Sequence, residues 1–190
     1  MLKRICLFVC LIFFTGLSYS TNQIKDQITL FDSDGRMMFK SYLEESPLGR
    51  FLADKKIRHE MVSTANYSGY TADWIIRDGK LYLENYYAEY KSLDKKEIEA
   101  HSKIKKLFPR AKGPVLAEWY TGTLHFGSGK ERQRIRFGHL TLFDYLYVYN
   151  IRNGIVESQK TYKYPANTDY YKKRDQETTA QVKKMMAEGK

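Results

Sequence analysis

Two runs of alternating apolar and polar residues, separated by the dipeptide 78–79, constrain this chain more than any other part of its sequence. The dipeptide is Asp-Gly, a favoured two-residue loop of β-hairpins. Such a loop predicts that Ile76 pairs with Leu81 and that Trp74 pairs with Leu83. The residues that then share one face are Tyr70, Ala72, Trp74, Ile76, Leu81 and Leu83. Because the apolar residues of both strands fall on this same face, we expect it to be buried.

Further strand patterns, separated by tight turns, lie on both sides of this hairpin. The expected strands are 27–31, 36–40, 115–126, 132–142, 143–152 and 155–162, with turns at Gly35, 127–129 and 153–154. Short strands with tight turns favour a mainly β fold. We expect about eight strands in an antiparallel twisted sheet, a sandwich or a partly closed barrel. An α+β fold is the alternative.

One helix is expected near residues 94–108. Asp94 and Glu97 have the spacing of a capping box, and apolar residues recur at helical spacing until Pro109 ends the run. We expect the apolar stripe of this helix to pack on the sheet.

The N-terminus has the pattern of a secretory signal. Lys3 and Arg4 precede an apolar run at 5–14, and small residues stand at positions −3 and −1 of a cut after Ser20. The run is shorter than the roughly 20 apolar residues of a membrane helix. We therefore expect residues 1–20 to be a cleaved signal peptide, with an uncleaved anchor as the alternative.

Both cysteines, Cys6 and Cys10, lie within this expected signal, so the mature chain would contain no thiol. This excludes disulfides, thiolate metal sites and cysteine nucleophiles from the mature chain. The remaining length suits one domain. We expect a single β-rich domain at 21–165, followed by a charged C-terminal helix or tail at 166–190.

The chain is basic. Its 32 Lys and Arg residues exceed its 22 Asp and Glu residues, and removal of the signal lowers the net charge from +10 to +8. We expect a basic exported protein to meet an acidic protein or an anionic envelope polymer before it meets nucleic acid. Solubility alone is the other explanation of this charge.

Three sequence blocks together resemble a family of small, uncharacterised bacterial proteins. The first block, 68–83, contains Gly-Tyr-x-x-x-Trp, and the second, 113–124, contains Trp-x-x-Gly-x-Leu. The third block is 137–154, and the similarity spans roughly residues 62–157. The resemblance implies a bacterial origin, and with the signal it implies a periplasmic or secreted location. It brings no catalytic residue to this chain.

Candidate catalytic residues form no established motif. The four histidines, His59, His101, His125 and His139, lack the spacing of a zinc site. His101 falls on the inner stripe of the expected helix, where a core histidine is the usual outcome. His125 and His139 flank the expected turn at 127–129 and would converge near Asp144 or Glu118 as an acid/base pair or a metal site, which is a minor alternative.

Dispersed acids are the other catalytic alternative. Asp73 beside Trp74 and Glu118 beside Trp119 are candidates for a hydrolase, because paired carboxylates leave no linear motif. We favour a protein that is not an enzyme, with no catalytic residue, metal or cofactor.

The candidate binding residues are a set of cations and a set of tyrosines. Alternation along one strand would point Lys130, Arg132, Arg134 and Arg136 to one side. Neighbouring tyrosines, Tyr145, Tyr147 and Tyr149, exceed what one core face needs. A second group of cations is Lys103, Lys105, Lys106, Arg110 and Lys112, and a solvated strand face is the plain alternative for the first set.

We therefore expect an exported, non-enzymatic binding protein that uses a basic, tyrosine-rich face. Its expected partner is an acidic protein, in the manner of an inhibitor or immunity protein. A cell-wall or polysaccharide binding module and a hydrolase are the alternatives. The sequence does not specify the oligomeric state, and we expect no membrane span after the signal is removed.

Overall fold

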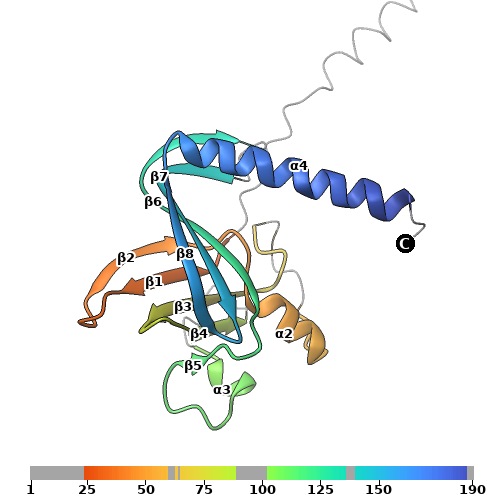
Figure 1. Ribbon diagram of the computed structural model, residues 1–190. Helices are drawn as coiled ribbons and strands as arrows, with labels where there is room; N and C mark the ends of the chain where they lie inside the picture. Colours follow the sequence, from red (N-terminus) through yellow and green to blue (C-terminus); the bar gives the residue numbers. More distant parts are fainter. Residues whose placement is uncertain (1–23, 60–62, 64, 89–101, 136–139, 188–190) are drawn as a thin grey trace, which may run out of the picture.

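A computed structural model describes residues 24–59, 63, 65–88, 102–135 and 140–187 of the 190-residue chain. Over this part the fold is mainly β, as predicted, with one mixed eight-stranded sheet in the order β2-β1-β3-β4-β8-β7-β6 and β5 beside β4 (Figure 1). The strands are β1 Gln27–Phe31, β2 Met37–Tyr42, β3 Tyr70–Arg77, β4 Lys80–Ala88, β5 Val115–Leu116, β6 Gly122–Ile135, β7 Leu140–Arg152 and β8 Ile155–Lys163. The described helices are α2 Leu48–Asp54, α3 Ile104–Leu107 and α4 Ala166–Ala187.

The hairpin β3–β4 has the predicted register. Ile76 pairs with Leu81, Trp74 pairs with Leu83, and the two turn residues have φ angles of 52° and 67°. A second tight hairpin joins β7 to β8, where the two residues of the 153–154 turn have φ angles of 49° and 78°. In both hairpins the Gly accepts the positive φ that a type I′ turn requires.

The sheet is mixed because β1 runs parallel to β3, with Ile28 beside Trp74. The other strand pairs are antiparallel, as expected. After β2 the chain passes through α2 before it enters β3. β2 ends beside the start of β1, so this connection carries the chain across that end of the sheet, from one side of β1 to the other, where β3 begins.

The predicted turn at 127–129 is wrong. β6 continues through these residues and pairs with β7 as far as Ile135, with register shifts on both sides of Glu131. A Cβ atom on Gly127 would lie 2.3 Å from the Phe143 ring, and Gly129 has a φ angle of +84°. The two glycines therefore allow close approach and bulging between long strands, and they do not reverse the chain.

The predicted helix at 94–108 falls largely outside the described residues, since 89–101 are not described. Within the described part, α3 forms one turn over Ile104–Leu107 and ends before Pro109. Ile104, Leu107 and Phe108 pack against the main core, as the amphipathic pattern predicted.

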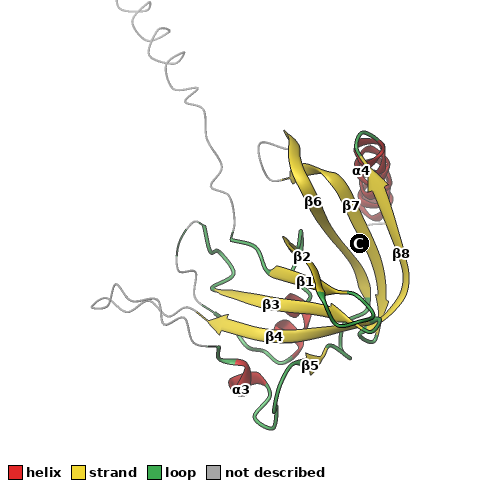
Figure 2. Ribbon diagram, turned by 90° about the vertical axis from the view of Figure 1, so that its left-hand side faces the viewer, coloured by secondary structure: helices red, strands yellow, loops and turns green. Residues whose placement is uncertain are grey.

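The core has two parts. The larger lies between the β1–β4 half of the sheet and the β6–β7 half, which stand at a steep angle to each other in Figure 2, and it includes Trp74, Tyr86 and Phe126. The smaller lies between β7 and α4 and includes Leu146 and Tyr171. β7 is therefore apolar on both faces.

The two edge strands of the sheet meet at one point. Leu43, just after β2, forms an isolated antiparallel bridge with Phe126 of β6, and the Glu44 amide donates a 3.0 Å hydrogen bond to the His125 carbonyl. We call this junction the seam. Within the described residues, no helix is both long enough and apolar enough to cross a membrane.

Candidate binding surfaces

Most of the described cations on β6 have carboxylate partners within the protein. Arg132 Nε lies 2.5 Å from an Asp144 carboxylate oxygen, and the backbone N–H of Lys130 donates to the other oxygen at 2.8 Å. Arg134 donates two hydrogen bonds to Glu131, at 2.7 and 3.1 Å. The Lys130 amide and the Arg132 guanidinium lower the pKa of Asp144. Arg136 lies outside the described residues.

The predicted tyrosines contribute more to the core than to the surface. Tyr149 is 8% exposed and contacts the Phe126 ring at a centroid distance of 5.2 Å. Tyr147 is half-buried, and its ring lies 4.9 Å from that of Phe39. Only Tyr145 among the three is exposed.

The predicted cations and tyrosines do not all lie on one face: Arg134 pairs with Thr141, on the same face of β7 as Tyr145, but Arg132 lies on the other face. Asp144, which holds Arg132, precedes Tyr145 in β7, and successive residues of a strand point to opposite faces. Alternation predicts which residues of one strand share a face, but it does not give the register between two strands, so it could not show whether the two sets lie on one face.

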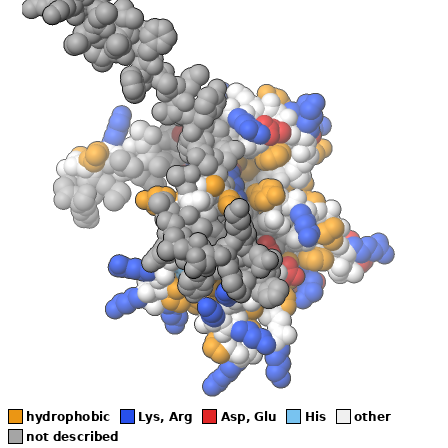
Figure 3. Space-filling model, turned by 180° about the vertical axis from the view of Figure 1, so that it is seen from behind, with side chains coloured by type: hydrophobic (Ala, Val, Ile, Leu, Met, Phe, Trp, Pro, Cys, Tyr) orange, Lys and Arg blue, Asp and Glu red, His pale blue; other side chains and the backbone are white. Residues whose placement is uncertain are grey.

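A denser set of cations lies where α2 meets α3. Segments 48–59 and 102–114 together contain nine Lys and Arg residues but only one acidic residue, Asp54. Phe51 holds the segments together, because its ring lies 5.3 Å from Phe108 and 4.7 Å from Trp119. We call these two segments the basic end. In Figure 3, Lys and Arg side chains gather at the lower end of the molecule, where α2 and α3 lie in Figure 1.

The cations of the basic end face solvent. The exposed members are Arg50, Lys55, Lys56, Arg58, Lys105, Lys106, Arg110 and Lys112. Within the described part of the chain, no ion pair links Arg50, Lys56 or Arg110 to a carboxylate, in contrast to Arg132 and Arg134.

A cavity of about 770 Å³ opens beside α2, and its lining includes Lys56, Arg58, His59 and Tyr70. His59 hydrogen-bonds the Tyr86 hydroxyl, and its ring lies 5.4 Å from that of Tyr70. Burial lowers the pKa of His59, so this imidazole is neutral near pH 7. The lysine and arginine supply the positive charge of the cavity.

A buried carboxylate joins three elements near this end. Asp26 is 6% exposed and accepts hydrogen bonds from the Ala72 amide at 3.0 Å, Trp74 Nε1 at 2.8 Å and Ser46 Oγ at 2.6 Å. Burial raises the pKa of Asp26, although these donors oppose the shift. With three donors bound to it, Asp26 fixes the start of β1 against β3 and α2, a structural role.

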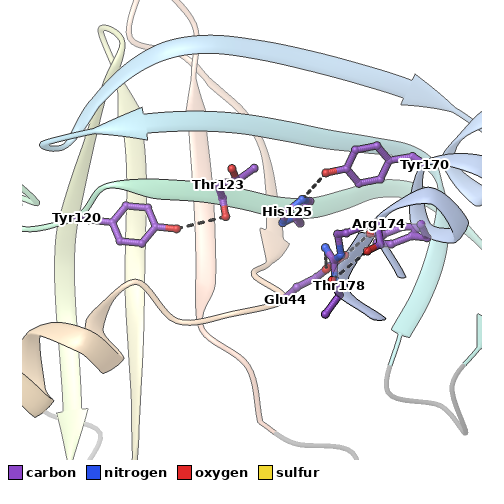
Figure 4. A network of polar contacts seen from close by, with 8 residues as sticks. Glu44, Tyr120, Thr123, His125, Tyr170, Arg174 and Thr178 are labelled. Carbon is purple, nitrogen blue, oxygen red and sulfur yellow. Dashed lines mark hydrogen bonds and ion pairs between the residues drawn. The ribbon is translucent and has the colours of Figure 1, made fainter. Parts of the chain in front are cut away.

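A polar network attaches α4 to the seam (Figure 4). The Tyr171 hydroxyl donates to one Glu44 oxygen, and Arg174 Nη1 lies 3.0 Å from the other. His125 Nε2 lies 2.7 Å from the Tyr170 hydroxyl. Burial lowers the pKa of His125 and raises that of Tyr171. The sequence indicated none of these pairs, because Glu44 and Arg174 are 130 positions apart.

The candidate catalytic residues that the structure describes do not form the pairs expected from the sequence. His125 contacts Tyr170, while Asp144 is engaged by Arg132, and His101 and His139 lie outside the described residues. Asp73 accepts hydrogen bonds from Asn85 and Tyr87. Among the described residues, no three His, Asp or Glu side chains converge as a metal site would require.

Comparison with known proteins does not assign the chain to a family. No family model, curated protein or solved structure matches the chain. The resemblance to a family of small bacterial proteins therefore stays a prediction, and so does the periplasmic or secreted location.

Proposed function

We propose that this protein is an exported, non-enzymatic binding protein that uses its basic end to bind an acidic protein. The observation that supports this most is the concentration of nine cations against one acidic residue in two contacting segments. The partner chemistry is the one predicted from the sequence, but the proposed surface is a different one. It is neither the set of cations Lys130, Arg132 and Arg134, which we call the β6 stripe, nor the set of predicted tyrosines, which lie on β7.

Electrostatics favours the basic end over the β6 stripe. Exposed like charges that lie close together produce a positive potential that attracts an anionic partner and raises its association rate. On β6, Asp144 lies beside Arg132 and Glu131 lies beside Arg134. These carboxylates cancel most of the positive potential of the two arginines. The two segments of the basic end contain one acidic residue, Asp54, among nine cations, of which Lys103 and Lys106 have an interaction within the protein.

The distribution of the cations favours a protein partner. They extend from Arg50 on α2 to Lys112 after α3, so they do not converge on a single point as they would around one small anion. A folded acidic protein presents carboxylates spaced over an area of this kind. An anionic envelope polymer is the alternative partner.

The experiment compares two double variants that each remove two positive charges. Lys105→Gln with Arg110→Gln alters the basic end, and Arg132→Gln with Arg134→Gln alters the β6 stripe. The probes are poly-L-glutamate, which represents an acidic protein surface, and isolated peptidoglycan. Binding of poly-L-glutamate is measured by fluorescence anisotropy at low salt and at about 0.15 M salt, and binding to peptidoglycan by sedimentation.

We expect the basic-end variant to bind poly-L-glutamate at least about threefold more weakly than the β6 variant. The effect is moderate because exposed charges attract a partner through solvent, where salt screens the attraction. We also expect added salt to weaken binding of the wild-type protein. Equal loss in the two variants, or binding that salt does not change, would contradict the proposed surface. Salt-sensitive binding to peptidoglycan but not to poly-L-glutamate would instead identify a cell-wall binding module.

A further inference from the structure

Helix α2 ends in a residue that does not suit its backbone conformation. The Lys56 amide donates a 2.9 Å hydrogen bond to the Ala53 carbonyl, and the Ile57 amide donates one of 2.9 Å to the Leu52 carbonyl. These two bonds form a Schellman motif, in which the residue with a left-handed conformation is usually glycine. Here that residue is Lys56, with a φ angle of 56°. The Cβ atom of a lysine is crowded in this conformation, so glycine would fit the end of the helix better.

The side chain that replaces glycine at this position lines an open cavity. It is the cavity of about 770 Å³ beside α2, a volume within the usual range of small-molecule sites. Lys56 and Arg58 line it and are exposed, and Ile57, His59 and Tyr70 line it and are half-buried. Each of these side chains therefore has surface that an occupant can contact.

The charge of this lining is positive. Lys56 and Arg58 are its charged side chains, and no acidic residue is among its described members. Within the part of the chain that the structure describes, neither cation forms an ion pair with a carboxylate. Guanidinium and ammonium groups both donate charge-assisted hydrogen bonds to oxyanions. The two cations therefore favour an occupant with an anionic oxygen group.

The rest of the lining favours an aromatic body on that occupant. The rings of His59 and Tyr70 lie 5.4 Å apart, and the side chain of Ile57 adds aliphatic surface. A neutral His59 offers its ring for contact without adding charge. Apolar and aromatic surface beside a few polar groups is typical of sites for small organic molecules. An inorganic ion would leave this surface uncovered.

We propose that this cavity binds a small aromatic oxyanion. Its anionic group contacts Lys56 and Arg58, and its aromatic body lies against Ile57, His59 and Tyr70. Lys56 thus supplies a contact that glycine, the better residue for the end of the helix, could not supply. This inference goes beyond the proposed function, because it concerns a small molecule and holds whether or not the basic end binds an acidic protein.

The first test uses two fluorescent probes that differ in one anionic group. The probe 8-anilinonaphthalene-1-sulfonate carries a sulfonate, and N-phenyl-1-naphthylamine has the same rings without it. We expect saturable binding of the sulfonate to the mature protein, and about fivefold weaker binding to Lys56→Gly and to Arg58→Gln, because each change removes a charge-assisted contact. The affinity for the neutral probe should change by less than about twofold. No saturable binding of the sulfonate, or equal weakening of both probes, would overturn the proposal.

The second test separates binding from folding and from general charge. Because glycine relieves the left-handed strain, Lys56→Gly should melt about 2 °C above the wild-type protein although it binds the sulfonate more weakly. Lys56→Arg keeps the charge and should bind the sulfonate within about twofold of the wild-type protein. Lys105→Gln removes one charge from the basic end outside the lining and should weaken the sulfonate less than Lys56→Gly does. Equal weakening by Lys56→Gly and Lys105→Gln would show that only the general charge of the basic end attracts the probe, and would overturn the proposal.

Discussion

Single buried or half-buried polar residues determine how distant segments of this protein meet. Asp26 joins β1 to β3 and α2 through three hydrogen bonds, and Glu44 joins the end of β2 to α4. The sequence indicates neither role, because the partners of Asp26 lie 20 to 48 positions away and no local pattern marks a buried acid. Local periodicity reports which face a residue occupies but not which distant donor it meets.

The first prediction at this scale concerns His125. Because burial lowers its pKa below the ordinary 6.5, the folded protein keeps His125 neutral at a pH at which the unfolded chain binds a proton. The unfolded state then holds more protons, so stability falls as the pH decreases below about 6.5. We expect the free energy of unfolding, measured with urea, to decline from pH 7 towards pH 5.

The control is His125→Gln, which can hydrogen-bond Tyr170 but does not titrate in this range. The charged groups facing His125 are Glu44, Glu45 and Arg174, and the variant leaves them in place. His59 has a pKa shift in the same direction, so His125→Gln should reduce the decline without removing it. An unchanged slope in the variant would show that the buried imidazole does not contribute to it.

Among the elements, the hairpins with two-residue turns were predictable and the long strands were not. In β3–β4 the turn dipeptide and the alternation of both strands agree, so the sequence fixes the register. In β6–β7 the sequence 127–129 has the composition of a turn, yet the strand continues through it. Glycine permits both a reversal and a close contact between strands, and the residue that Gly127 contacts closely, Phe143, is too distant in the sequence for a local pattern to indicate which one occurs.

A prediction for β6 follows from this close contact. Gly127→Ala places a Cβ atom 2.3 Å from the Phe143 ring, so the strands must shift. We expect a loss of about 2 kcal/mol in the free energy of unfolding, the usual cost of overpacking. The matched control is Gly113→Ala, which has no atom within 4 Å of the added Cβ and should change stability by less than about 0.5 kcal/mol.

Phe143→Ala provides the second half of the test, because it removes Cγ and Cδ2, the two atoms nearest to the new Cβ, and leaves only the Phe143 Cβ at 3.0 Å. Gly127→Ala should therefore cost less in the Phe143→Ala background than in the wild-type protein, a coupling that a double-mutant cycle measures. Strictly additive losses would mean that the contact between Gly127 and Phe143 does not limit the strand spacing.

At the scale of the whole molecule, composition predicted the charge but not its location. The net charge of +10 is evident from the sequence, and alternation along one strand directed attention to Arg132 and Arg134. In the folded protein Asp144 and Glu131 pair with those arginines, while packing of Phe51 on Phe108 brings two other basic segments together. The fold therefore concentrates positive charge at the end formed by α2 and α3.

This arrangement predicts opposite effects of the two double variants on stability. At low salt, removing two cations from the basic end relieves repulsion, so Lys105→Gln with Arg110→Gln should raise the free energy of unfolding by roughly 0.5 kcal/mol. Arg132→Gln with Arg134→Gln removes two ion pairs and should lower it. Urea unfolding at about 0.01 M and about 0.15 M salt measures both effects, and the higher salt shortens the Debye length from about 30 to about 8 Å.

Salt should bring the two variants closer to the wild-type protein, because it screens the repulsion at the basic end and the attraction on β6 alike. It should also stabilise the wild-type protein, since the two segments of the basic end contain nine cations and one acidic residue, and the cations repel one another less when salt is added. Shifts of the same sign in both variants at low salt would contradict the charge arrangement itself. Opposite signs together with equal loss of poly-L-glutamate binding would confirm the charge arrangement but place the binding surface elsewhere.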